Sequence, residues 1–477
     1  MSTGRGALAL VLHAHMPYVE GFGTWPFGEE WLWDAIAQVY LPLLGVVEDS
    51  PVTVGLTPVL CDQLEQLPAE AGTRLRAYLQ DVKAPLHERD GAYLEEAGAA
   101  TEAAEVRRAA GDYLAAEQAL EAIGGHVLGA YRGAAEASPL ELITSAATHA
   151  ILPLLATRAG IALQVAGGVD SHRGRFGSFA GAFWLPECAY GPGLEHELAR
   201  HGVRVFVVDQ THVHGPAAPE QLEPIATEAG PVAVPLDWQA VSLVWSNDAG
   251  YPANPAYRDY HRATAGGAHP WANGGDPYEH GAALDQARRD AEDFVARAVA
   301  RLDRYAADRG RPGLLCCPLD AELLGHWWYE GPAWLAAVLE QAGASGLELV
   351  TLSEGVARAE PAQRPLEASS WGRGGDLSTW DSPPVADLLF TARTAELELV
   401  TRARSCHRGA LAGAARELLA LQSSDWAFMV SRGLAEPYAR ERAAGHARAL
   451  GRWRGGTFVP TTRGLAPGLD VSALLGP

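Results

Sequence analysis

The sequence predicts an α/β fold with a parallel sheet and two additional helical regions. Over most of residues 1–360, short apolar runs alternate with segments of helical periodicity, which is typical of parallel sheets whose strands are joined by helices. Residues 86–137 are rich in Ala and Glu and contain no strand-like run, and the pattern is helical again from residue 361 onward. We therefore expect an α/β domain over 1–85 and 138–360, a helical insertion over 86–137 and an α-helical C-terminal domain over 361–477.

Nine short apolar runs are the candidate strands. They cover residues 7–12, 52–57, 141–145, 163–166, 182–185, 203–208, 243–245, 314–317 and 347–351. Before the run at 314–317, apolar residues recur at helical spacing and predict a long helix; they are Phe294, Val295, Ala298, Val299, Leu302 and Tyr305. Further long helices are expected over 394–422 and 435–454.

Composition excludes several classes of protein. The chain has 37 Lys and Arg against 58 Asp and Glu, and this net charge of −21 disfavours binding to a phosphate backbone, so nucleic acid is not an expected partner. No apolar stretch approaches the roughly 18 residues of a membrane span, and the five cysteines lack the spacing of a disulfide framework or a zinc site. We expect a soluble, cytoplasmic protein with no membrane partner. Its 14 tryptophans are numerous, and indole rings either fill a core or present flat faces to a ligand.

Polar residues follow the predicted strands. No glycine-rich phosphate loop follows the first strand, which disfavours nucleotide binding; His13 and His15 occupy that position instead. His149 lies just beyond the third strand, and Glu187 and Asp320 follow the runs at 182–185 and 314–317. The carboxyl ends of strands in a parallel barrel share one face, where active sites are found, so this pattern predicts an enzyme.

Glu187 and Asp320 are the candidate catalytic pair. Each follows an apolar strand end and has aromatic neighbours, and a pair of carboxyl groups in such a setting suits the cleavage of glycosidic bonds. Two other interpretations are open from position alone. A carboxylate at a strand end is commonly a helix N-cap or one partner of an ion pair, and His13 with His15 could bind the metal of a metal-dependent hydrolase.

Several long motifs, in order along the chain, resemble those of glycoside hydrolase family 57, and most closely those of its 1,4-α-glucan branching enzymes. They are residues 13–18, 25–31, 184–190, 320–332, 370–372 with Trp380, and 424–426. The resemblance implies an incomplete (β/α)7 barrel with an inserted helical domain and a helical C-terminal domain. It also implies a retaining mechanism without metal or other cofactor, in which Glu187 is the nucleophile and Asp320 the general acid/base.

The same resemblance implies an α-glucan as substrate and a set of binding residues. Tyr251 is similar to the tyrosine of a mobile loop that shields the site in this family. The stacking residues implied are Trp25, Trp271, Trp371 and Trp380, and the polar residues of the cleft are His15, Arg262 and Asp425. We add Trp328 to the stacking candidates and His149 to the binding residues, and we expect Trp31, Trp33 and Trp245 to serve in packing.

Other functions fit the same residues. A 4-α-glucanotransferase or an α-amylase of the same family would use Glu187 and Asp320 with a different acceptor. A glucan-binding protein without activity would keep the groove and lose the chemistry, although both carboxylates are present.

Overall fold

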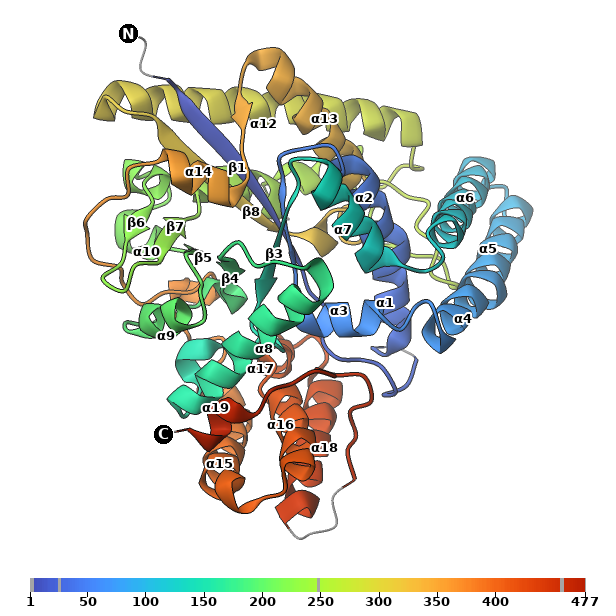
Figure 1. The fold of residues 1–477 in the computed structure, drawn as a ribbon. Coiled ribbons are helices and arrows are strands. Elements are labelled where there is room, and N and C mark those ends of the chain that lie inside the picture. Colours follow the sequence, from blue (N-terminus) through green and yellow to red (C-terminus); the bar gives the residue numbers. More distant parts are fainter. Residues whose placement is uncertain (1–3, 25–26, 247–248, 455–458, 477) are drawn as a thin grey trace.

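A curled sheet forms the centre of the molecule (Figure 1). The computed structural model describes residues 4–24, 27–246, 249–454 and 459–476. Within these residues, the strand order is β6-β7-β5-β4-β3-β2-β1-β8, and β9 pairs with β1. The strands are β1 (Gly6–Ala14), β2 (Thr53–Leu56), β3 (Glu141–Ser145), β4 (Ala182–Trp184), β5 (Val205–Val208), β6 (Ile225–Ala226), β7 (Val232–Pro235), β8 (Gly313–Asp320) and β9 (Glu348–Leu349).

The sheet is an incomplete barrel. All neighbouring pairs between β7 and β8 along this path are parallel, and β6 adds an antiparallel edge beside β7. The path ends at β6 on one side and β8 on the other, without a ladder between them in the described residues. One backbone hydrogen bond, from the amide of Asp237 to the carbonyl of Cys316 (2.8 Å), connects the segment after β7 to β8. This confirms the predicted fold class.

Helices cover the outside of the sheet, as Figure 1 shows. Around the sheet they are α1 (Glu29–Ala35), α2 (Leu41–Val47), α3 (Pro58–Leu64), α8 (Arg158–Phe176), α9 (Leu194–Arg200), α10 (Thr211–His214), α11 (Trp238–Trp245), α12 (His280–Arg309), α13 (Gly331–Ser345) and α14 (Leu352–Arg358). The stripe predicted between 294 and 305 lies on α12, where most of its members are buried. In the described part of the chain, no helix combines the length and apolarity needed to cross a membrane.

Two of the predicted strands are wrong. Residues 163–166 lie inside α8 and residues 243–245 at the end of α11. Both runs belong to helices with side-chain N-caps, because Thr157 accepts from the Gly160 amide and Asp237 from the Ala240 amide. A short apolar run is compatible with a buried helix and with a buried strand, and the two N-caps favour the helix. The strands β6 and β7 were not predicted.

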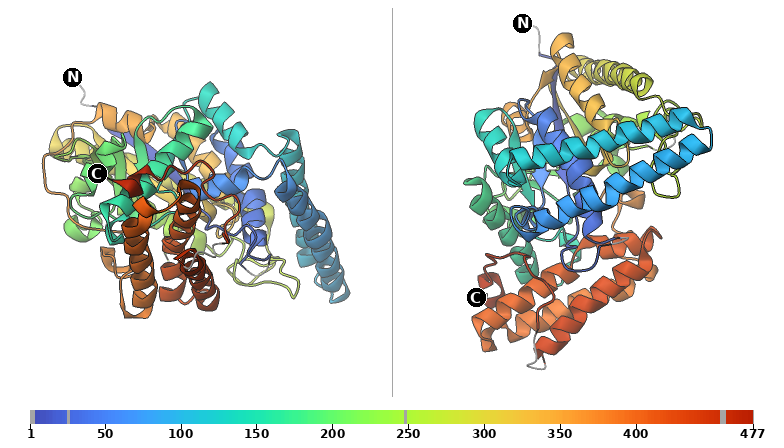
Figure 2. Two further views of the ribbon diagram at one scale, coloured as in Figure 1. Left: turned by 60° about the horizontal axis from the view of Figure 1, so that its bottom comes forward. Right: turned by 90° about the vertical axis from the view of Figure 1, so that its right-hand side faces the viewer.

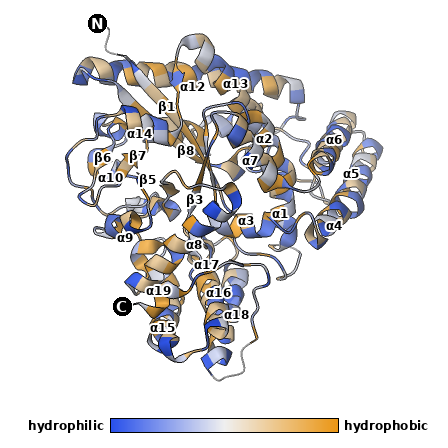
Figure 3. Cartoon of the chain, in the orientation of Figure 1, coloured by the Kyte–Doolittle hydropathy of each residue, from blue (hydrophilic) through white to orange (hydrophobic). Residues whose placement is uncertain are grey.

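The insertion and the C-terminal region consist of helices. Between α3 and β3 lie α4 (Glu70–Ala77), α5 (Ala84–Glu96), α6 (Ala100–Ala122) and α7 (Val127–Ala137), the last three over the range predicted for the insertion; α5 and α6 lie side by side as a long pair in Figure 2. The C-terminal helices are α15 (Ala386–Arg402), α16 (Arg408–Leu421), α17 (Ser424–Ser431), α18 (Glu436–Arg454) and α19 (Ser472–Leu475). The helix predicted over 394–422 is divided between α15 and α16. In Figure 3, hydrophilic residues recur along the insertion and C-terminal helices, on the outside of the molecule.

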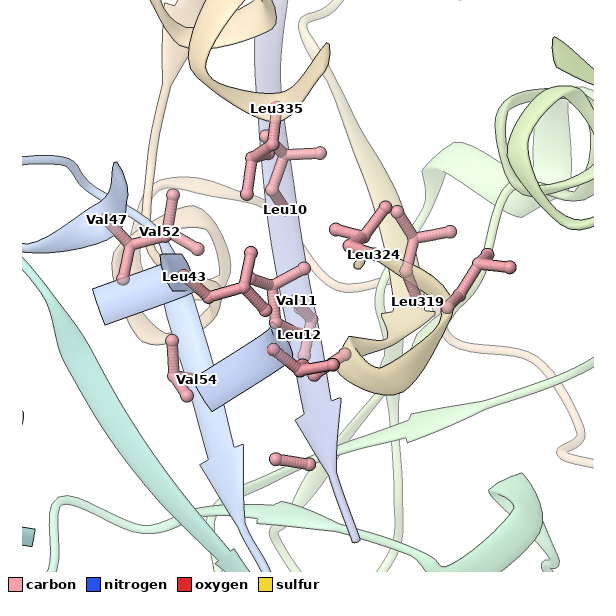
Figure 4. Packing of buried hydrophobic residues seen from close by; sticks show 14 of the residues in the cluster. Leu10, Val11, Leu12, Leu43, Val47, Val52, Val54, Leu319, Leu324 and Leu335 are labelled. Carbon is pink, nitrogen blue, oxygen red and sulfur yellow. The ribbon is translucent and has the colours of Figure 1, made fainter. Parts of the chain in front are cut away.

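Strand β1 forms the centre of the core. Its residues 7–12 are at most 8% exposed, and it pairs with β8 along one edge and with β2 and β9 along the other. Figure 4 shows Leu10, Val11 and Leu12 packed among leucines and valines of α2, β2, β8 and α13. Burying each such side chain contributes roughly 1.5–3 kcal/mol, so β1 and β8 are a rigid support for the residues at their carboxyl ends.

Candidate active site

Strand register brings the first predicted site residues together. His13 of β1 pairs with Asp320 of β8, and Ser145 of β3 pairs with Trp184 of β4. Glu187 follows β4 in a short helical turn, η4 (Pro186–Cys188). The two predicted catalytic carboxyl groups therefore lie at the carboxyl ends of their strands, at the same end of the barrel.

The backbone is strained at this face. Glu187, Cys188 and His149 have φ angles of 58°, 50° and 58°, and the one other non-glycine residue with positive φ in the described chain is Ala466. Left-handed conformations cost free energy in residues with a Cβ and persist where the surroundings impose them. Three strained residues at one face are typical of a functional site.

Glu187 is held by an indole. Trp371 Nε1 donates a hydrogen bond of 2.7 Å to Glu187 Oε2, and the Trp371 amide donates to the Glu187 carbonyl at 3.0 Å. His149 Nδ1 lies 3.9 Å from the other carboxylate oxygen. Burial and the nearby Asp320 charge raise the pKa of Glu187 to about 8, and the bond from Trp371 acts against that shift.

Asp320 has a different environment. Burial, followed by the charge of Glu322, raises the pKa of Asp320 to about 8, while His15 opposes the shift. Glu322 is fixed by hydrogen bonds from Tyr40 Oη (2.7 Å) and the His15 amide (3.0 Å). Burial raises the pKa of Glu322 to about 7, although both donors favour its ionised form. Tyr40 ends a π-helical segment, η1 (Ile36–Tyr40), and such segments recur at functional sites.

A cluster of histidines joins the sheet to the C-terminal helices. His15 Nε2 lies 3.0 Å from Asp425 Oδ2 on α17, and His15 Nδ1 lies 3.2 Å from Thr57 Oγ1. The rings of His15 and His149 stack at 4.0 Å, and Nε2 of His149 lies 3.0 Å from Nε2 of His13. Burial favours the neutral form of Asp425, but the charge and hydrogen bond of His15 outweigh it and lower the pKa of Asp425 to about 2. Burial lowers the pKa of both His13 and His149.

This arrangement can hold one proton and one negative charge on neighbouring carboxyl groups. Burial raises the pKa of both groups to about 8, so the protonated form of each is favoured near neutral pH. Trp371 donates to Glu187, whereas Glu322 places negative charge beside Asp320. These contacts favour the ionised form at Glu187 and the protonated form at Asp320. No group of three or more His, Cys, Asp or Glu side chains in the described ranges has the geometry to hold a metal ion.

The predicted stacking residues differ in what they offer a ligand. Trp371 is half-buried beside Glu187 and packs edge-on against Trp184 at 5.1 Å. Trp328 and Trp380 are 1% and 2% exposed, so in this structure their ring faces contact protein. Trp25 lies outside the described residues.

Three predicted binding residues, Tyr251, Arg262 and Trp271, lie on the loop between α11 and α12. They are not part of the carboxylate cluster, by which we mean Glu187, Asp320, Glu322, His15, His149 and Asp425. The guanidinium of Arg262 covers the ring of Trp271 at 4.0 Å and donates to the Gly275 carbonyl at 3.1 Å. Tyr251 Oη donates to Asp293 Oδ2 of α12 at 2.8 Å, and its ring packs against Trp334. These contacts hold the three side chains to the loop itself and to α12 and α13.

Sequence reasoning missed Glu322, Tyr40 and Trp245. Glu322 stands two residues after Asp320, and that spacing at a strand end is the signal that could have indicated it. Tyr40 gave no such signal, because its role depends on a π-helical turn. Trp245 was expected to serve in packing, yet it is 43% exposed and stacks on Trp371 at 6.1 Å.

A barrel-like parallel sheet that presents two half-buried carboxyl groups beside an indole ring is typical of enzymes acting on glycosidic bonds. Comparison with known families agrees: the profile of glycosyl hydrolase family 57 matches residues 9–366, and the profile of the 1,4-alpha-glucan branching enzyme C-terminal region matches residues 391–453. The chain belongs to glycosyl hydrolase family 57 and is a glycosyl-transferring enzyme of that family.

Its relatives include named branching enzymes. A 1,4-alpha-glucan branching enzyme of Thermococcus kodakarensis is 32% identical, over 94% of this chain and 73% of the relative. A probable 1,4-alpha-glucan branching enzyme of Mycobacterium tuberculosis is 35% identical, over 93% and 91%. The structure of a GH57-type branching enzyme from Pyrococcus horikoshii is similar with a TM-score of 0.89 and 29% identity, over 99% of this chain and 97% of that one.

Proposed function

We propose that the protein is a 1,4-α-glucan branching enzyme that works by a retaining mechanism. The observation that carries this proposal is the pair of carboxyl groups in unlike surroundings, Glu187 with an indole donor and Asp320 beside a second carboxylate. The matched C-terminal profile and the names of the relatives support branching as the outcome.

In the first step, a Glu187 oxygen attacks the anomeric carbon of an α-1,4-linked glucose. The bond between that carbon and O4 of the next glucose breaks, its electron pair stays on O4, and Asp320 donates its proton there. The product is a covalent glucosyl-enzyme on Glu187. The hydrogen bond from Trp371 orients the attacking carboxylate and favours its ionised form.

In the second step, Asp320 acts as a base. It takes the proton from the 6-hydroxyl of an acceptor glucan as that oxygen attacks the anomeric carbon and the bond to Glu187 breaks. The product is an α-1,6 branch, and both carboxyl groups return to their starting protonation. The transferred chain keeps its α configuration because the carbon is displaced twice.

His15, His149 and Asp425 have the positions and chemistry to hold the hydroxyl groups of the reacting sugar. The pair of His15 and Asp425 fixes an imidazole and a charged carboxylate beside the catalytic cluster. The imidazole of His149 is held in place by Ser424 Oγ, 2.9 Å from its Nδ1, and by stacking on His15. Such a set orients polar groups that can discriminate among sugar hydroxyls.

Transfer to a sugar rather than to water requires a covered site. We propose that Tyr251 moves with its loop to cover the glucosyl-enzyme. Its hydroxyl donates to Asp293, so closure would exchange that bond for contacts with the substrate.

Amylose provides the test. The enzyme should abolish iodine staining and form α-1,6 linkages, and debranching with isoamylase should release short linear chains. Redistributed linear chains without branches would instead identify a 4-α-glucanotransferase, and reducing ends alone an α-amylase. Solved structures named as such enzymes are similar at 24% identity or less, so they support the fold alone.

The setting we propose is the synthesis of a branched, glycogen-like glucan in a reducing compartment such as the cytoplasm. All five cysteines are free thiols, and four of them are buried. This usage fits a compartment where disulfides do not form.

A further inference from the structure

Two adjacent tryptophans have opposite environments. Trp328 is 1% exposed and packs edge-on against Tyr257, whereas Trp327 is 47% exposed. A tight turn separates them: the Gly325 amide donates to the Trp328 carbonyl (2.8 Å) and the Trp328 amide to the Leu323 carbonyl (2.8 Å). The turn anchors Trp328 in the core and directs Trp327 outward.

Glycine is required for this turn. Gly325 has a φ of +115°, and a Cβ there would lie 2.1 Å from the carbonyl oxygen of Gln38. The close approach to the segment that carries Tyr40 fixes the turn against the barrel. The outward position of Trp327 is therefore built into the backbone.

Trp327 belongs to an aromatic platform, which we define as Trp327, Tyr260, His326 and His269. The Tyr260 ring lies 4.6 Å from Trp327, 5.5 Å from His326 and 6.0 Å from His269, to which it is parallel. Tyr260 Oη lies 3.4 Å from His326 Nε2. The platform thus combines ring faces with polar edges, the combination that sugar rings require.

The platform is anchored before any ligand binds. The amide of Arg258 donates to Glu330 Oε1 at 3.1 Å, and its guanidinium pairs with Glu105 on helix α6 of the insertion. His269 Nδ1 lies 3.1 Å from the Arg262 carbonyl, which closes the loop around Tyr260. A site that is ordered in advance loses less entropy on binding.

The position of the platform indicates which part of a glucan it would meet. The Trp327 amide donates to the carbonyl of Glu322 at 3.3 Å, and Glu322 stands two residues after Asp320. The platform is thus continuous with the side of the site that carries the acid/base, where the leaving group departs and the acceptor enters. Trp245, which is also exposed, stacks on Trp371 on the Glu187 side.

We propose that Trp327 and Tyr260 bind glucose units of an α-1,4-glucan on the acceptor side, a few units from the bond that reacts. This inference rests on the proposed function and extends it to two residues that are not among the stacking residues predicted from the sequence. Trp327 is 47% exposed, whereas the ring of Trp271 is covered by the guanidinium of Arg262.

Calorimetric binding of maltoheptaose to a Glu187→Gln background tests the proposal. Adding Trp327→Ala should weaken binding roughly tenfold, which corresponds to about 1.4 kcal/mol, and Trp327→Phe should recover part of the loss because one ring remains. Tyr93→Ala, which removes a ring that is 68% exposed on α5, is the matched control and should leave the affinity unchanged.

Kinetics provides the second readout. In the otherwise unaltered enzyme, Trp327→Ala should raise KM for long acceptors more than for maltotetraose while kcat changes little. Thermal unfolding of each variant establishes that it is folded, and Trp327→Phe serves if the alanine variant is not. Equal affinity with and without Trp327 would overturn the platform alone. Failure of Glu187→Gln with Trp327 intact to bind any α-glucan would overturn the proposed function as well.

Discussion

The carboxylate cluster and the loop between α11 and α12 use aromatic and charged residues in opposite ways. In the cluster, His15 is bonded to Asp425 of α17 and Trp371 to Glu187, the backbone is strained at Glu187 and His149, and the pKa values of Glu187 and Asp320 are raised. On the loop, Arg262 and Tyr251 are bonded to surface partners on the loop and on α12. The comparison separates a part of the site built for chemistry from a part that can exchange contacts with a long polymer.

The largest expected effect lies in the cluster. Glu187→Gln should lower kcat by roughly 10⁴-fold or more, because a glutamine amide cannot replace the carboxylate that forms the covalent intermediate. Asp320→Asn should be equally severe on amylose and much less severe on an α-glucoside whose leaving group needs no proton. Rates on both substrates measure the difference, and near-normal activity of either variant on amylose would refute the mechanism.

The next effect tests whether the C-terminal helices share in the chemistry. Asp425→Asn removes the charge paired with His15 and should lower kcat/KM by roughly 10- to 100-fold without unfolding the protein. Asp387→Asn is the control, since Asp387 pairs with Arg440 on the surface of the same region. Equal rates for the two variants would assign the Asp425 pair to stability instead.

The third effect is a change in pH dependence. The Glu322 charge raises the pKa of Asp320, so in Glu322→Gln that pKa falls and Asp320 loses its proton at lower pH. The alkaline limb of the kcat/KM profile should therefore move to lower pH, while the amide oxygen can still accept from Tyr40. Glu340→Gln, an exposed change on α13, should leave the profile in place. An alkaline limb that stays in place in Glu322→Gln would argue against Asp320 as the acid.

A smaller effect belongs to the loop. Asp293→Asn weakens the bond that holds Tyr251 on α12, and we expect a change of about two- to fivefold in the ratio of transfer to hydrolysis. Products on amylose and reducing ends measure that ratio. Asp285→Asn, on the same helix, is the control, and identical ratios would exclude Tyr251 as a cover for the site.

The smallest expected effect is that of metal removal. Exhaustive chelation should leave the activity unchanged, because the proposed steps use carboxyl groups alone. The comparison is the rate on amylose before and after dialysis against chelator. Activity lost on chelation and restored by a divalent cation would favour the metal-dependent interpretation of His13 and His15.

Much of the fold was predictable because local pattern and burial agree. The runs at 7–12 and 314–317 are continuous and apolar because β1 and β8 are buried on both faces, and both were predicted as strands. Prediction failed at 163–166 and 243–245, where a short apolar run belongs to a helix that a capping residue begins. The limits of the three domains stay a prediction.

The residues of the candidate site could be predicted where they lie in a recognisable sequence motif. Glu187, His15, His149 and Asp425 lie within contact of one another, and the roles of these residues and of Asp320 stay predictions. The exposure of each side chain could not be predicted from the sequence. Trp327 and Trp328 are the same residue type, and the turn at Gly325, packed against the carbonyl of Gln38, places Trp327 in solvent and Trp328 in the core.

The bond between His15 and Asp425 joins residues 410 positions apart. During synthesis, His15 emerges early, directly after β1, but its partner leaves the ribosome only when most of the chain has been made. Contacts of such long range form slowly and late in folding. Under the proposed function, a nascent chain would hold Glu187 and Asp320 well before Asp425 could join them, which would delay attack on glucan until the C-terminal helices have docked.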